Sequence, residues 1–301
     1  MFYSKGSVIT VGTFDGVHVG HQKILSKLMQ RAREHHLKAV VLTLFPHPRM
    51  VLNKDSDLKL LLTIEERKNQ LKKLGIDEVV IMPFTKTFSN LSPLEYVENI
   101  LLNELNTKYI IIGYDHRFGK NRSANILDLK QFGEQFGFEV EEISALEVES
   151  VAVSSTKIRK ALANGDIETA NTYLGYPYFL TGKVVKGRGI GRTIDFPTAN
   201  ISIDESYKLI PKNGVYVVKS AINNREVFGM MNIGTKPTVD GTQQSIEVHW
   251  FGVNENLYDI VIKIELLERL RDEHKFESLD ALKNQLKTDQ KNALHYIKQH
   301  V

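Results

Sequence analysis

The sequence of 301 residues has no cysteine. The chain can therefore form no disulfide bond and no thiolate zinc site, and it has no cysteine nucleophile. It also lacks a long apolar run. The longest, residues 39–45, is strand-sized and already contains Thr43, whereas a membrane-spanning helix needs about 18 or more apolar residues. Residues 1–12 lead directly into a strand pattern without a signal-peptide layout. We accordingly expect a cytoplasmic protein without a membrane partner.

The sequence also lacks an excess of charge of one sign. Lysine and arginine number 39 against 36 aspartate and glutamate residues, a formal net charge of +3. The two signs are mixed along the chain, with no basic patch and no stripe of aromatic and basic residues. These absences argue against a nucleic-acid partner and leave small anionic molecules as the expected ligands. The oligomeric state does not follow from the sequence.

The chain has the composition of an ordinary globular protein. Hydrophobic residues make up 42% and charged residues 25%, both close to the averages for soluble domains. At about 100–200 residues per domain, the length favours two domains. The pattern changes near Tyr176, and we expect domains over residues 1–177 and 178–301.

The first half alternates short apolar strands with helical stretches. Strands are expected over residues 7–11, 39–45, 78–82, 109–112 and 138–143, and helices over residues 22–35, 64–74, 92–105 and 127–136. This alternation predicts an α/β domain with a doubly wound parallel sheet. Such sheets bind ligands beyond the carboxyl ends of their strands.

The second half has period-two runs, such as residues 214–218 and 245–250, separated by glycine- and proline-containing turns. Repeated short strands of this kind predict a small antiparallel β-barrel. A final stretch with helical spacing, residues 279–297, predicts a C-terminal helix.

Residues 12–21, GTFDGVHVGH, follow the first expected strand and open the first helix. Glycines allow a close approach of backbone to ligand, and a helix N-terminus offers free N–H groups and a positive dipole end. His18 and His21 would point the same way there, and their imidazoles could donate hydrogen bonds to phosphate oxygens as charge develops. The alternative is that they only cap a helix at the surface.

Residues 153–159, VSSTKIR, follow the fifth expected strand and begin another helix. Their hydroxyls can cap that helix, but hydroxyls and N–H groups with Lys157 and Arg159 can equally hold a triphosphate. The pairing of this segment with residues 12–21 resembles nucleotidyltransferases that transfer an adenylyl or cytidylyl group by direct in-line attack. The chain has no Walker A sequence, so a P-loop ATPase is not supported.

Two further segments follow expected strands. Residues 43–48, TLFPHP, come after the second strand and residues 113–119, GYDHRFG, after the fourth. A doubly wound sheet places ligand loops at both positions. Two basic pairs have a plain interpretation as solvated charges: Arg117 with Arg122, and Arg67 with Lys68.

The expected barrel contains a second group of motifs. Residues 186–192, KGRGIGR, form a turn whose arginines could clamp a phosphate, although the spacing is not that of a dinucleotide fingerprint. In residues 196–201, FPTANI, Thr198 and Asn200 point to one face of an extended segment. A hydroxyl and an amide oxygen are hard ligands suited to Mg²⁺, and the alternative is an ordinary turn with a polar pair.

Glu247 lies in a strand-like stretch and shares one face of it with His249. A carboxylate in partly apolar surroundings is a candidate general base for a primary hydroxyl. An exposed strand residue would give the same pattern.

In this order, the motifs resemble the family of bacterial bifunctional riboflavin kinase/FAD synthetases over nearly the whole chain. The segments up to residue 159 are similar to the FMN adenylyltransferase module. GRGIGR, PTAN, NIGTKPT of residues 232–238 and E-x-H, followed by residues 270–276, are similar to the riboflavin kinase module. The resemblance implies an enzyme that phosphorylates riboflavin to FMN and then adenylylates FMN to FAD, using ATP and Mg²⁺. Riboflavin, FMN, FAD and ATP would be its small-molecule partners.

The resemblance also implies roles for individual residues. In the adenylyltransferase, the charge-stabilising catalytic residues would be His18, His21 and Arg159, and the ATP-binding residues Gly12, Phe14, Asp15, Gly16, Gly20, Asp115, Ser154, Ser155 and Thr156. In the kinase, the ATP-binding residues would be Gly187, Gly189, Gly191 and Arg192, the magnesium ligands Thr198 and Asn200, and the flavin contacts Arg271 and Phe276. Glu247 would take the proton from the ribityl 5′-hydroxyl as it attacks the γ-phosphate.

Two positions depart from the family pattern. Asp195 stands where many members have glycine, and Ala124 replaces a glycine that often follows Arg122. These departures put in question the approach to Thr198 and the closure of the loop beyond Gly119.

Two other functions are kept as alternatives. One is an adenylyltransferase acting on another phosphorylated substrate, such as pantetheine phosphate or nicotinate mononucleotide, against which PTAN and Glu247 in a separate barrel argue. The other is a non-catalytic flavin- or RNA-binding protein, because barrels often bind nucleic acids. The mixed charge argues against RNA.

Overall fold

The computed structural model describes residues 6–52, 57–114, 116–143, 153–187, 191, 194–238 and 241–301. The chain forms two compact units, Met1–Ser155 and Thr156–Val301. The second unit begins two helices ahead of the barrel, whereas the sequence suggests a boundary at the barrel itself, between residues 177 and 178.

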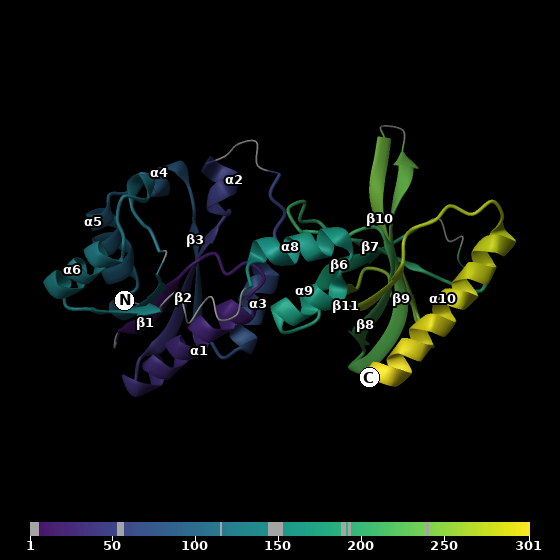
Figure 1. Cartoon of the computed structure of the whole chain (residues 1–301), viewed down its shortest axis with the longest axis horizontal. Coiled ribbons are helices and arrows are strands. Elements are labelled where there is room, and N and C mark those ends of the chain that lie inside the picture. The colour runs from purple at the N-terminus through teal and green to yellow at the C-terminus, as the bar shows by residue number, and fades with distance from the viewer. Residues whose placement is uncertain are drawn as a thin grey trace. The chain divides into compact units, whose positions relative to one another are not determined.

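The first unit consists of alternating strands and helices (Figure 1). In chain order these are β1 (Ser7–Val11), α1 (Val19–Glu34), β2 (Lys38–Phe45), α2 (Pro48–Leu52), α3 (Ile64–Lys73), β3 (Glu78–Pro83), α4 (Lys86–Ser89), α5 (Pro93–Glu95), the π-helix η1 (Tyr96–Glu104), β4 (Thr107–Gly113), the 3₁₀-helix η2 (Lys120–Arg122), α6 (Ile126–Phe136) and β5 (Glu139–Ile143).

The strands form one parallel sheet in the order β3-β2-β1-β4-β5. The doubly wound parallel sheet predicted from the sequence is therefore confirmed. The chain moves outward from β1 to β3 on one side and returns to β4 on the other, so the strand order reverses between β1 and β4. Parallel sheets bind ligands at the carboxyl ends of the strands on either side of such a reversal.

Alternate residues of the strands face opposite sides of the sheet. Ile9, Ile110 and Ile112 belong to a buried core that includes residues of η1 and α6. On the other side, α1 lies along β1, β2 and β4 and buries Leu25 and Leu28. Both faces are covered, as an all-parallel sheet requires.

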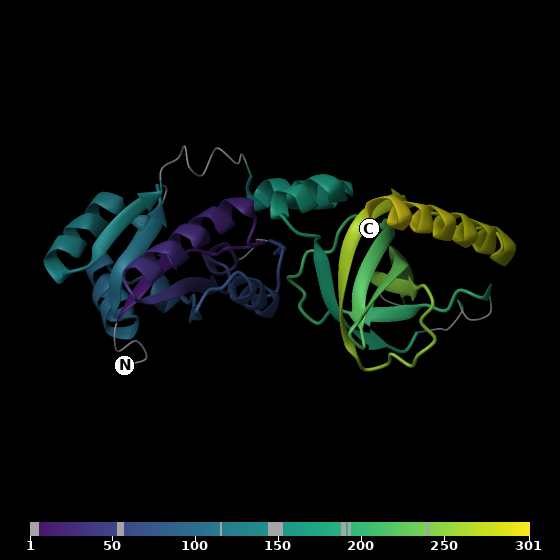
Figure 2. The same cartoon turned by 90° about the horizontal axis from the view of Figure 1, so that it is seen from below.

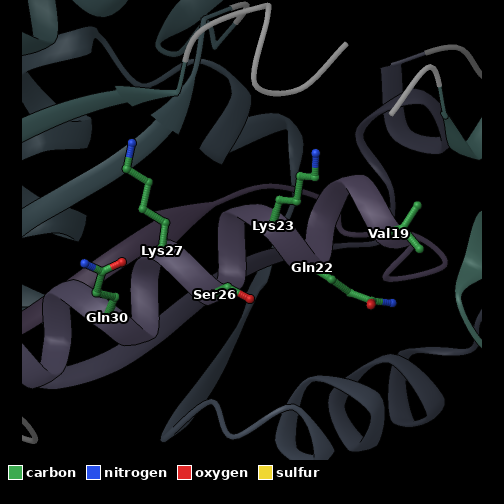
Figure 3. A pocket seen from close by; sticks show the side chains of 6 residues that line it. All are labelled: Val19, Gln22, Lys23, Ser26, Lys27 and Gln30. Atoms are coloured by element: carbon green, nitrogen blue, oxygen red, sulfur yellow. The ribbon is translucent and has the colours of Figure 1, made fainter. Parts of the chain in front are cut away.

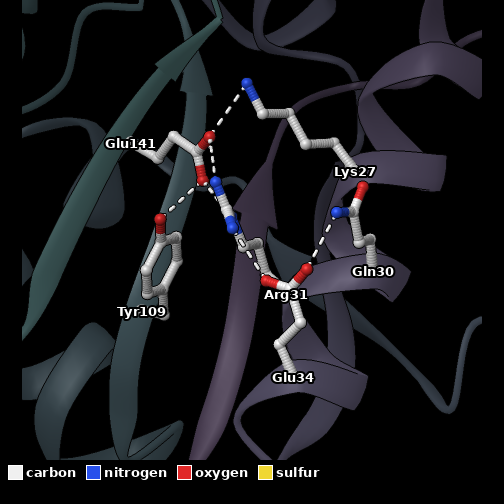
Figure 4. Close-up of polar contacts among 6 residues, drawn as sticks. All are labelled: Lys27, Gln30, Arg31, Glu34, Tyr109 and Glu141. Carbon is white, nitrogen blue, oxygen red and sulfur yellow. Dashed lines mark hydrogen bonds and ion pairs between the residues drawn. The ribbon is translucent and has the colours of Figure 1, made fainter.

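A polar network ties α1 to β4 and β5 (Figure 4). The Glu141 carboxylate accepts from Arg31 Nε at 2.7 Å, Lys27 Nζ at 2.9 Å and the Tyr109 hydroxyl at 2.5 Å. The Arg31 hydrogen bond is the largest of the causes that lower the pKa of Glu141 to about 2. Burial, together with the same carboxylate, raises the pKa of Tyr109 to about 12.

One expected helix differs from its prediction. The spacing over residues 92–105 predicts a single α-helix, but the chain forms only the short α5 there and continues as the π-helix η1. A π-helix is defined by i→i+5 backbone hydrogen bonds, and the spacing of apolar residues does not distinguish these from the bonds of an α-helix.

The second unit holds the closed barrel predicted from the sequence, preceded by two helices and followed by one. Its elements are α8 (Ser155–Asn164), α9 (Ile167–Leu174), β6 (Phe179–Val185), β7 (Ala199–Ser202), β8 (Gly214–Ile222), β9 (Arg225–Thr238), β10 (Gly241–Trp250), β11 (Val261–Arg271) and α10 (Leu279–His300). The barrel order is β10-β7-β6-β11-β8-β9, with antiparallel pairing throughout. The helix α10 lies against its outside, in contact with β8, β9 and β11 (Figure 2).

No helix in the described part of the chain combines the length and the apolar character needed to cross a membrane.

Candidate functional site

A cavity of about 810 Å³ opens at the carboxyl edge of the parallel sheet. Gly12 after β1, Pro48 after β2 and Gly113 at the end of β4 line it. The ligand loops expected after the second and fourth strands are therefore brought together, at the point where the strand order reverses.

One side of the cavity is aromatic. Phe84, Phe88, Tyr96 and Phe118 line it, and successive rings lie 5.6, 6.2 and 5.5 Å apart between centroids. Such a wall can hold a flat apolar ring system by stacking and edge contacts.

The lining also contains basic side chains. Arg49, Arg117 and Arg122 line the cavity together with His21 and His116. Arg117 and Arg122 are exposed, as the interpretation as solvated charges expects, and they also line this cavity. Guanidinium groups on a concave surface suit phosphate oxygens.

The two predicted histidines form one cluster at the start of α1. His18 is the N-cap, and its Nδ1 accepts a hydrogen bond from the backbone N–H of His21 at 3.3 Å. The proton of a neutral His18 ring is therefore on Nε2. The two rings stack with centroids 3.6 Å apart, so the expectation that they point the same way is confirmed. A Cβ on Gly20 would lie 3.2 Å from His18 Nδ1, which explains the small residue between them.

The His21 ring lines the cavity while its Nδ1 is buried, without a hydrogen-bond partner among the described residues. Burial, then the neighbouring His18, then Arg67 lower the pKa of His21 well below its ordinary value. At neutral pH the ring is therefore an uncharged hydrogen-bond donor rather than a cation.

The Asp15 side chain is turned into the protein, where it is 1% exposed. Its carboxylate accepts the backbone N–H groups of Leu61 at 3.0 Å and Leu62 at 3.2 Å. Its carbonyl oxygen accepts the Ser155 hydroxyl at 2.8 Å. Asp15 thus fixes the turn that carries the predicted ATP-binding residues Phe14 and Gly16.

Three residues of that turn, Phe14, Gly16 and Val17, have positive φ angles of 46°, 84° and 39°. The Phe14 ring meets His21 edge-on at 5.1 Å. Positive φ angles are unfavourable for Phe14 and Val17, which are not glycines. Contacts with the rest of the fold therefore hold the turn in this conformation.

Arg67 requires a correction. The charged pattern of its helix predicts a solvated side chain, but Arg67 is 0% exposed. Its Nη1 donates to the Thr43 hydroxyl at 3.2 Å, and its Nη2 lies 3.8 Å from the Asp15 carboxylate. The burial arises because α3 packs beneath the turn, a tertiary relationship that helical periodicity does not contain. The capping box of Thr63 and Glu66, which begins α3, is a sequence signal for the helix but not for the buried face.

The remaining adenylyltransferase residues are only partly described. Asp115 lies outside the described residues. Ser155, the first residue of α8, is the last residue of the first unit, whereas Thr156 and Arg159, in the first turns of α8, belong to the second unit. Their phosphate-binding roles stay predictions. Ala124 is buried and pairs with Phe118 through two backbone hydrogen bonds of 3.1 Å, so the loop beyond Gly119 closes without a glycine there.

The barrel carries a second polar cluster. The Thr198 hydroxyl donates to the Glu247 carboxylate at 3.0 Å, and Asn200 of β7 is paired in register with Glu247 of β10. Thr198 and Glu247 are 49 positions apart in the sequence. The barrel therefore brings together the predicted general base and both predicted metal ligands.

His249 supports this cluster from the same strand. Its Nδ1 lies 2.8 Å from the Pro197 carbonyl oxygen, which can only accept, so Nδ1 carries the proton. Phe196 and Phe251 contact the ring edge-on at 5.3 and 5.8 Å. His249 thereby positions the residue before Thr198, a role that the E-x-H pattern did not by itself reveal.

The glycines of the preceding turn leave space for this cluster. A Cβ on Gly187 would lie 1.9 Å from Asn200 Nδ2, and one on Gly191 would lie 2.1 Å from the Phe196 carbonyl oxygen. Gly189 and Arg192 lie outside the described residues. Asp195 has a φ of 65°, a conformation that favours glycine, and its carboxylate is held by Lys283 of α10 at 2.7 Å.

The two predicted flavin contacts lie near α10. The Arg271 guanidinium binds the Asp289 carboxylate through Nε at 2.9 Å and Nη2 at 2.7 Å, and its carbon lies 5.8 Å from the Phe276 ring centroid. Arg271 therefore fastens β11 to α10, and a flavin contact by either residue stays a prediction.

A separate depression of about 560 Å³ lies on the outer face of α1 (Figure 3). It is lined by Val19, Gln22, Lys23, Ser26, Lys27 and Gln30 of that one helix. None of the predicted site residues lines it.

The two units of this chain are similar to the two domains of known proteins. A family model described as FAD synthetase matches residues 2–157, and one described as riboflavin kinase matches residues 174–297. The bifunctional riboflavin kinase/FMN adenylyltransferase of Buchnera aphidicola subsp. Schizaphis graminum is 40% identical over 95% of this chain and 92% of its own length. That of Bacillus subtilis is 38% identical over 97% of this chain and 92% of its own length.

A solved structure from Streptococcus pneumoniae, described as a macrolide-efflux protein, is also similar to this chain. It is 33% identical, with a TM-score of 0.86, over 96% of this chain and 93% of that one. The parallel sheet and the barrel thus combine an FAD synthetase unit with a riboflavin kinase unit. The chain belongs to the family of bifunctional riboflavin kinase/FMN adenylyltransferases.

Proposed function

We propose that this chain makes FAD from riboflavin in two steps. Riboflavin is phosphorylated to FMN in the barrel, and FMN is adenylylated to FAD at the edge of the parallel sheet, with one ATP used in each step. The observation that carries the proposal is that each unit has its own polar cluster, Thr198 with Glu247 in one and the His18–His21 pair in the other.

In the kinase step, the ribityl 5′-hydroxyl oxygen attacks the γ-phosphorus of ATP, the bond to ADP breaks, and the hydroxyl proton passes to Glu247. Thr198 donates to this carboxylate and orients it. Phosphoryl transfer depends mainly on positioning and charge neutralisation, so a general base and a rigid strand pair are the expected contribution of the protein.

The donor set at this site fits Mg²⁺. Thr198 uses its proton for Glu247, and its hydroxyl oxygen keeps a lone pair for a cation. Asn200, which is paired in register with Glu247, supplies an amide oxygen. Few protein ligands are typical of Mg²⁺, which keeps several waters and binds substrate phosphates. Bound there, the ion would neutralise charge on the ATP phosphates.

In the adenylyl transfer, an FMN phosphate oxygen attacks the α-phosphorus of ATP and the bond to pyrophosphate breaks. The aromatic wall of the cavity suits the isoalloxazine ring, and its arginines suit the phosphates. Neutral His21 would donate to a phosphate oxygen as charge develops there. Arg159 and Thr156 would contribute further donors, and Ser155, whose hydroxyl donates to the Asp15 carbonyl oxygen, would contribute the backbone N–H of a helix start. The reaction needs no nucleophile from the protein.

We further propose that the ligands are these small molecules alone, without nucleic acid or membrane, and that the enzyme works in the cytoplasm. The mixed charge of the chain supports the first of these statements. The efflux activity for which the Streptococcus pneumoniae protein is named is not carried over to this chain, because both family models and the curated relatives describe flavin enzymes.

The test is incubation of the full chain with riboflavin, ATP and MgCl₂, followed by chromatography of the flavins. Formation of FMN and then FAD, with release of ADP and pyrophosphate, is expected. Unchanged riboflavin would contradict the kinase assignment, and FMN that never becomes FAD would contradict the second. A parallel reaction with pantetheine phosphate or nicotinate mononucleotide in place of FMN tests the rival adenylyltransferases.

A further inference from the structure

Arg67 is a fully buried permanent charge that the two reactions do not account for. Burying a guanidinium costs several kcal/mol unless its surroundings compensate. Arg67 lies in the first turns of α3, where the Thr63 side chain accepts from the Glu66 N–H and the Glu66 side chain accepts from the Thr63 N–H. That reciprocal cap fixes the start of the helix and with it the position from which Arg67 extends.

The guanidinium reaches the turn between β1 and α1 by two routes. Its Nη1 donates to the Thr43 hydroxyl, which in turn donates to the Thr13 carbonyl oxygen at 3.2 Å. Its Nη2 faces the Asp15 carboxylate at 3.8 Å. The Arg67 side chain therefore contacts Asp15 directly and Thr13 through Thr43, and these two residues flank Phe14 in the sequence.

The turn is attached to the entry of α3 as well. The Asp15 carboxylate accepts the N–H groups of Leu61 and Leu62. Asp15 is thus held between these amides and Arg67. The result is a rigid support on the buried side of the turn from which α1 and its histidine pair begin.

Arg67 also acts electrostatically on His21. The positive charges that lower the pKa of His21 are His18 on the same helix and Arg67 on α3. Asp15 is the buried carboxylate next to Arg67, and it partly offsets that charge. Towards the cavity, the charged or titratable groups that share the lining with His21 are Arg49, His116, Arg117 and Arg122.

We propose that Arg67 is a positioning residue for adenylyl transfer: it holds the turn that precedes His18 and His21 through Thr43 and Asp15, and it supplies a fixed buried positive charge beside His21. This inference rests on the adenylyl transfer proposed above. Arg67 does not touch the reacting phosphates. It keeps the helix start in the geometry that the phosphates require, and its charge adds to burial and to His18 in disfavouring a protonated His21.

Two substitutions separate charge from geometry. Arg67→Met removes the charge at similar length, and Arg67→Lys keeps the charge but loses the planar fork. Lys68→Met is the matched control, because it removes one positive charge from the next position of the same helix. The kinase step of each full-length preparation reports on the second unit, and NMR titration of the His21 ring reports on its protonation.

We expect Arg67→Met to lower the rate of FAD formation from FMN about 10²-fold, since displacement of a catalytic group by about 1 Å costs this much. The titration midpoint of His21 should rise, because a nearby positive charge has been removed. Arg67→Lys should keep the His21 midpoint and lose about tenfold in rate, an intermediate value. Lys68→Met should change neither, and FMN formation should be unaffected in all three variants.

An Arg67→Met enzyme that makes FAD within threefold of the wild-type rate would overturn the proposal. An unchanged titration midpoint of His21 in the Arg67→Met variant would also overturn it, because an arginine with only a structural role would leave that midpoint where it is. If Arg67→Met does not fold, Arg67→Lys decides, and an unchanged rate of FAD formation in that variant overturns the proposal. A wild-type chain that makes no FAD at all would instead refute the proposed function, so the two failures are distinguishable.

Discussion

At the scale of single residues, the carboxylate proposed as the base of the kinase reaction is held in place by one other segment, residues 197–198. Thr198 donates to Glu247, and His249 fixes the Pro197 carbonyl next to Thr198. None of these contacts joins residues adjacent in the chain. The site therefore exists only once β7 and β10 have paired.

Glu247→Gln keeps the size and the hydrogen-bonding shape of the side chain but removes the base. General-base catalysis contributes about 10²–10⁴-fold, so FMN formation should fall by at least about 10²-fold. FAD formation from supplied FMN should be unchanged. Both rates are measured by chromatography, with Glu226→Gln, an exposed carboxylate of β9 paired with Lys219, as the control. A loss of less than tenfold in the kinase step would remove Glu247 from the role of base.

Gly187→Ala tests the packing around the second predicted metal ligand. A Cβ there would lie 1.9 Å from Asn200 Nδ2, so the Asn200 side chain must turn away. We expect kinase activity to fall about tenfold or more, as displaced binding groups do. In an Asn200→Ala background the same substitution should cost little further, because the displaced side chain is already absent. Equal losses in both backgrounds would contradict a role for Asn200.

The burial of Arg67 and the pairing of Arg271 with Asp289 show where sequence reasoning about side chains ends. Hydrophobic periodicity predicts the helix that carries Arg67, but the face that meets the turn between β1 and α1 is decided by how α3 packs. Asp289 lies 18 residues from Arg271, and nothing in either segment indicates the pair. By contrast, the histidine pair at the start of α1 is local, three residues apart, and its common orientation follows from the capping hydrogen bond between them.

At the scale of elements, the strands and most helices of the parallel sheet follow from apolar periodicity, and so does the alternation that makes the sheet parallel. The π-helix η1 does not, because its bonding pattern leaves no periodicity of its own in a stretch this short. Asp195 shows a similar limit. Its position in a left-handed turn explains why a glycine is common there, while the Lys283 contact from α10 is visible only in the fold.

The contact of α1 with β4 and β5 makes the first unit sensitive to acid. The folded-state pKa of Glu141 is held near 2, below the ordinary value of about 4.3. The stabilisation it provides is present above the ordinary value and is lost as the pH falls through about 5 to 2.

Glu141→Gln should therefore destabilise the first unit by about 1.5–3 kcal/mol at pH 7, the range for a hydrogen bond to a charged group, and by less at pH 3.5. Hydrogen exchange of peptides from β4 and β5 measures the effect. Glu142→Gln, the next residue and more exposed partner of Lys130, is the control. Trp250, the single tryptophan, lies in the barrel and reports by fluorescence that the second unit is unaltered. A deficit that is the same at both pH values would contradict this explanation.

At the scale of the whole molecule, the two units should be separable. The helices α8 and α9 are bonded to the barrel: the Lys212 N–H donates to the Leu162 carbonyl oxygen, and Asn171 bonds both Leu266 and Tyr178. All residues proposed for the kinase step lie beyond residue 177.

A fragment of residues 178–301 should convert riboflavin to FMN and make no FAD. A fragment of residues 156–301 should do the same with a higher melting temperature, because it keeps the buried apolar side chains of α8 and α9 in place. Calorimetry and the flavin assay on both fragments provide the measurements. A folded fragment that makes no FMN would show that the kinase needs the first unit.

The most direct measurement of the central claim, two independent sites in one chain, is a mixing experiment. His21→Ala should lose about 10²–10³-fold in FAD formation, the cost of one donor at developing charge, and should accumulate FMN. Glu247→Gln should leave the supplied riboflavin unconverted. Neither variant alone should convert riboflavin to FAD at an appreciable rate, but an equimolar mixture should do so, because FMN released by the first is adenylylated by the second. Independence of the two sites would be contradicted if the mixture stayed inactive while each variant kept its remaining activity, or if either substitution abolished both steps.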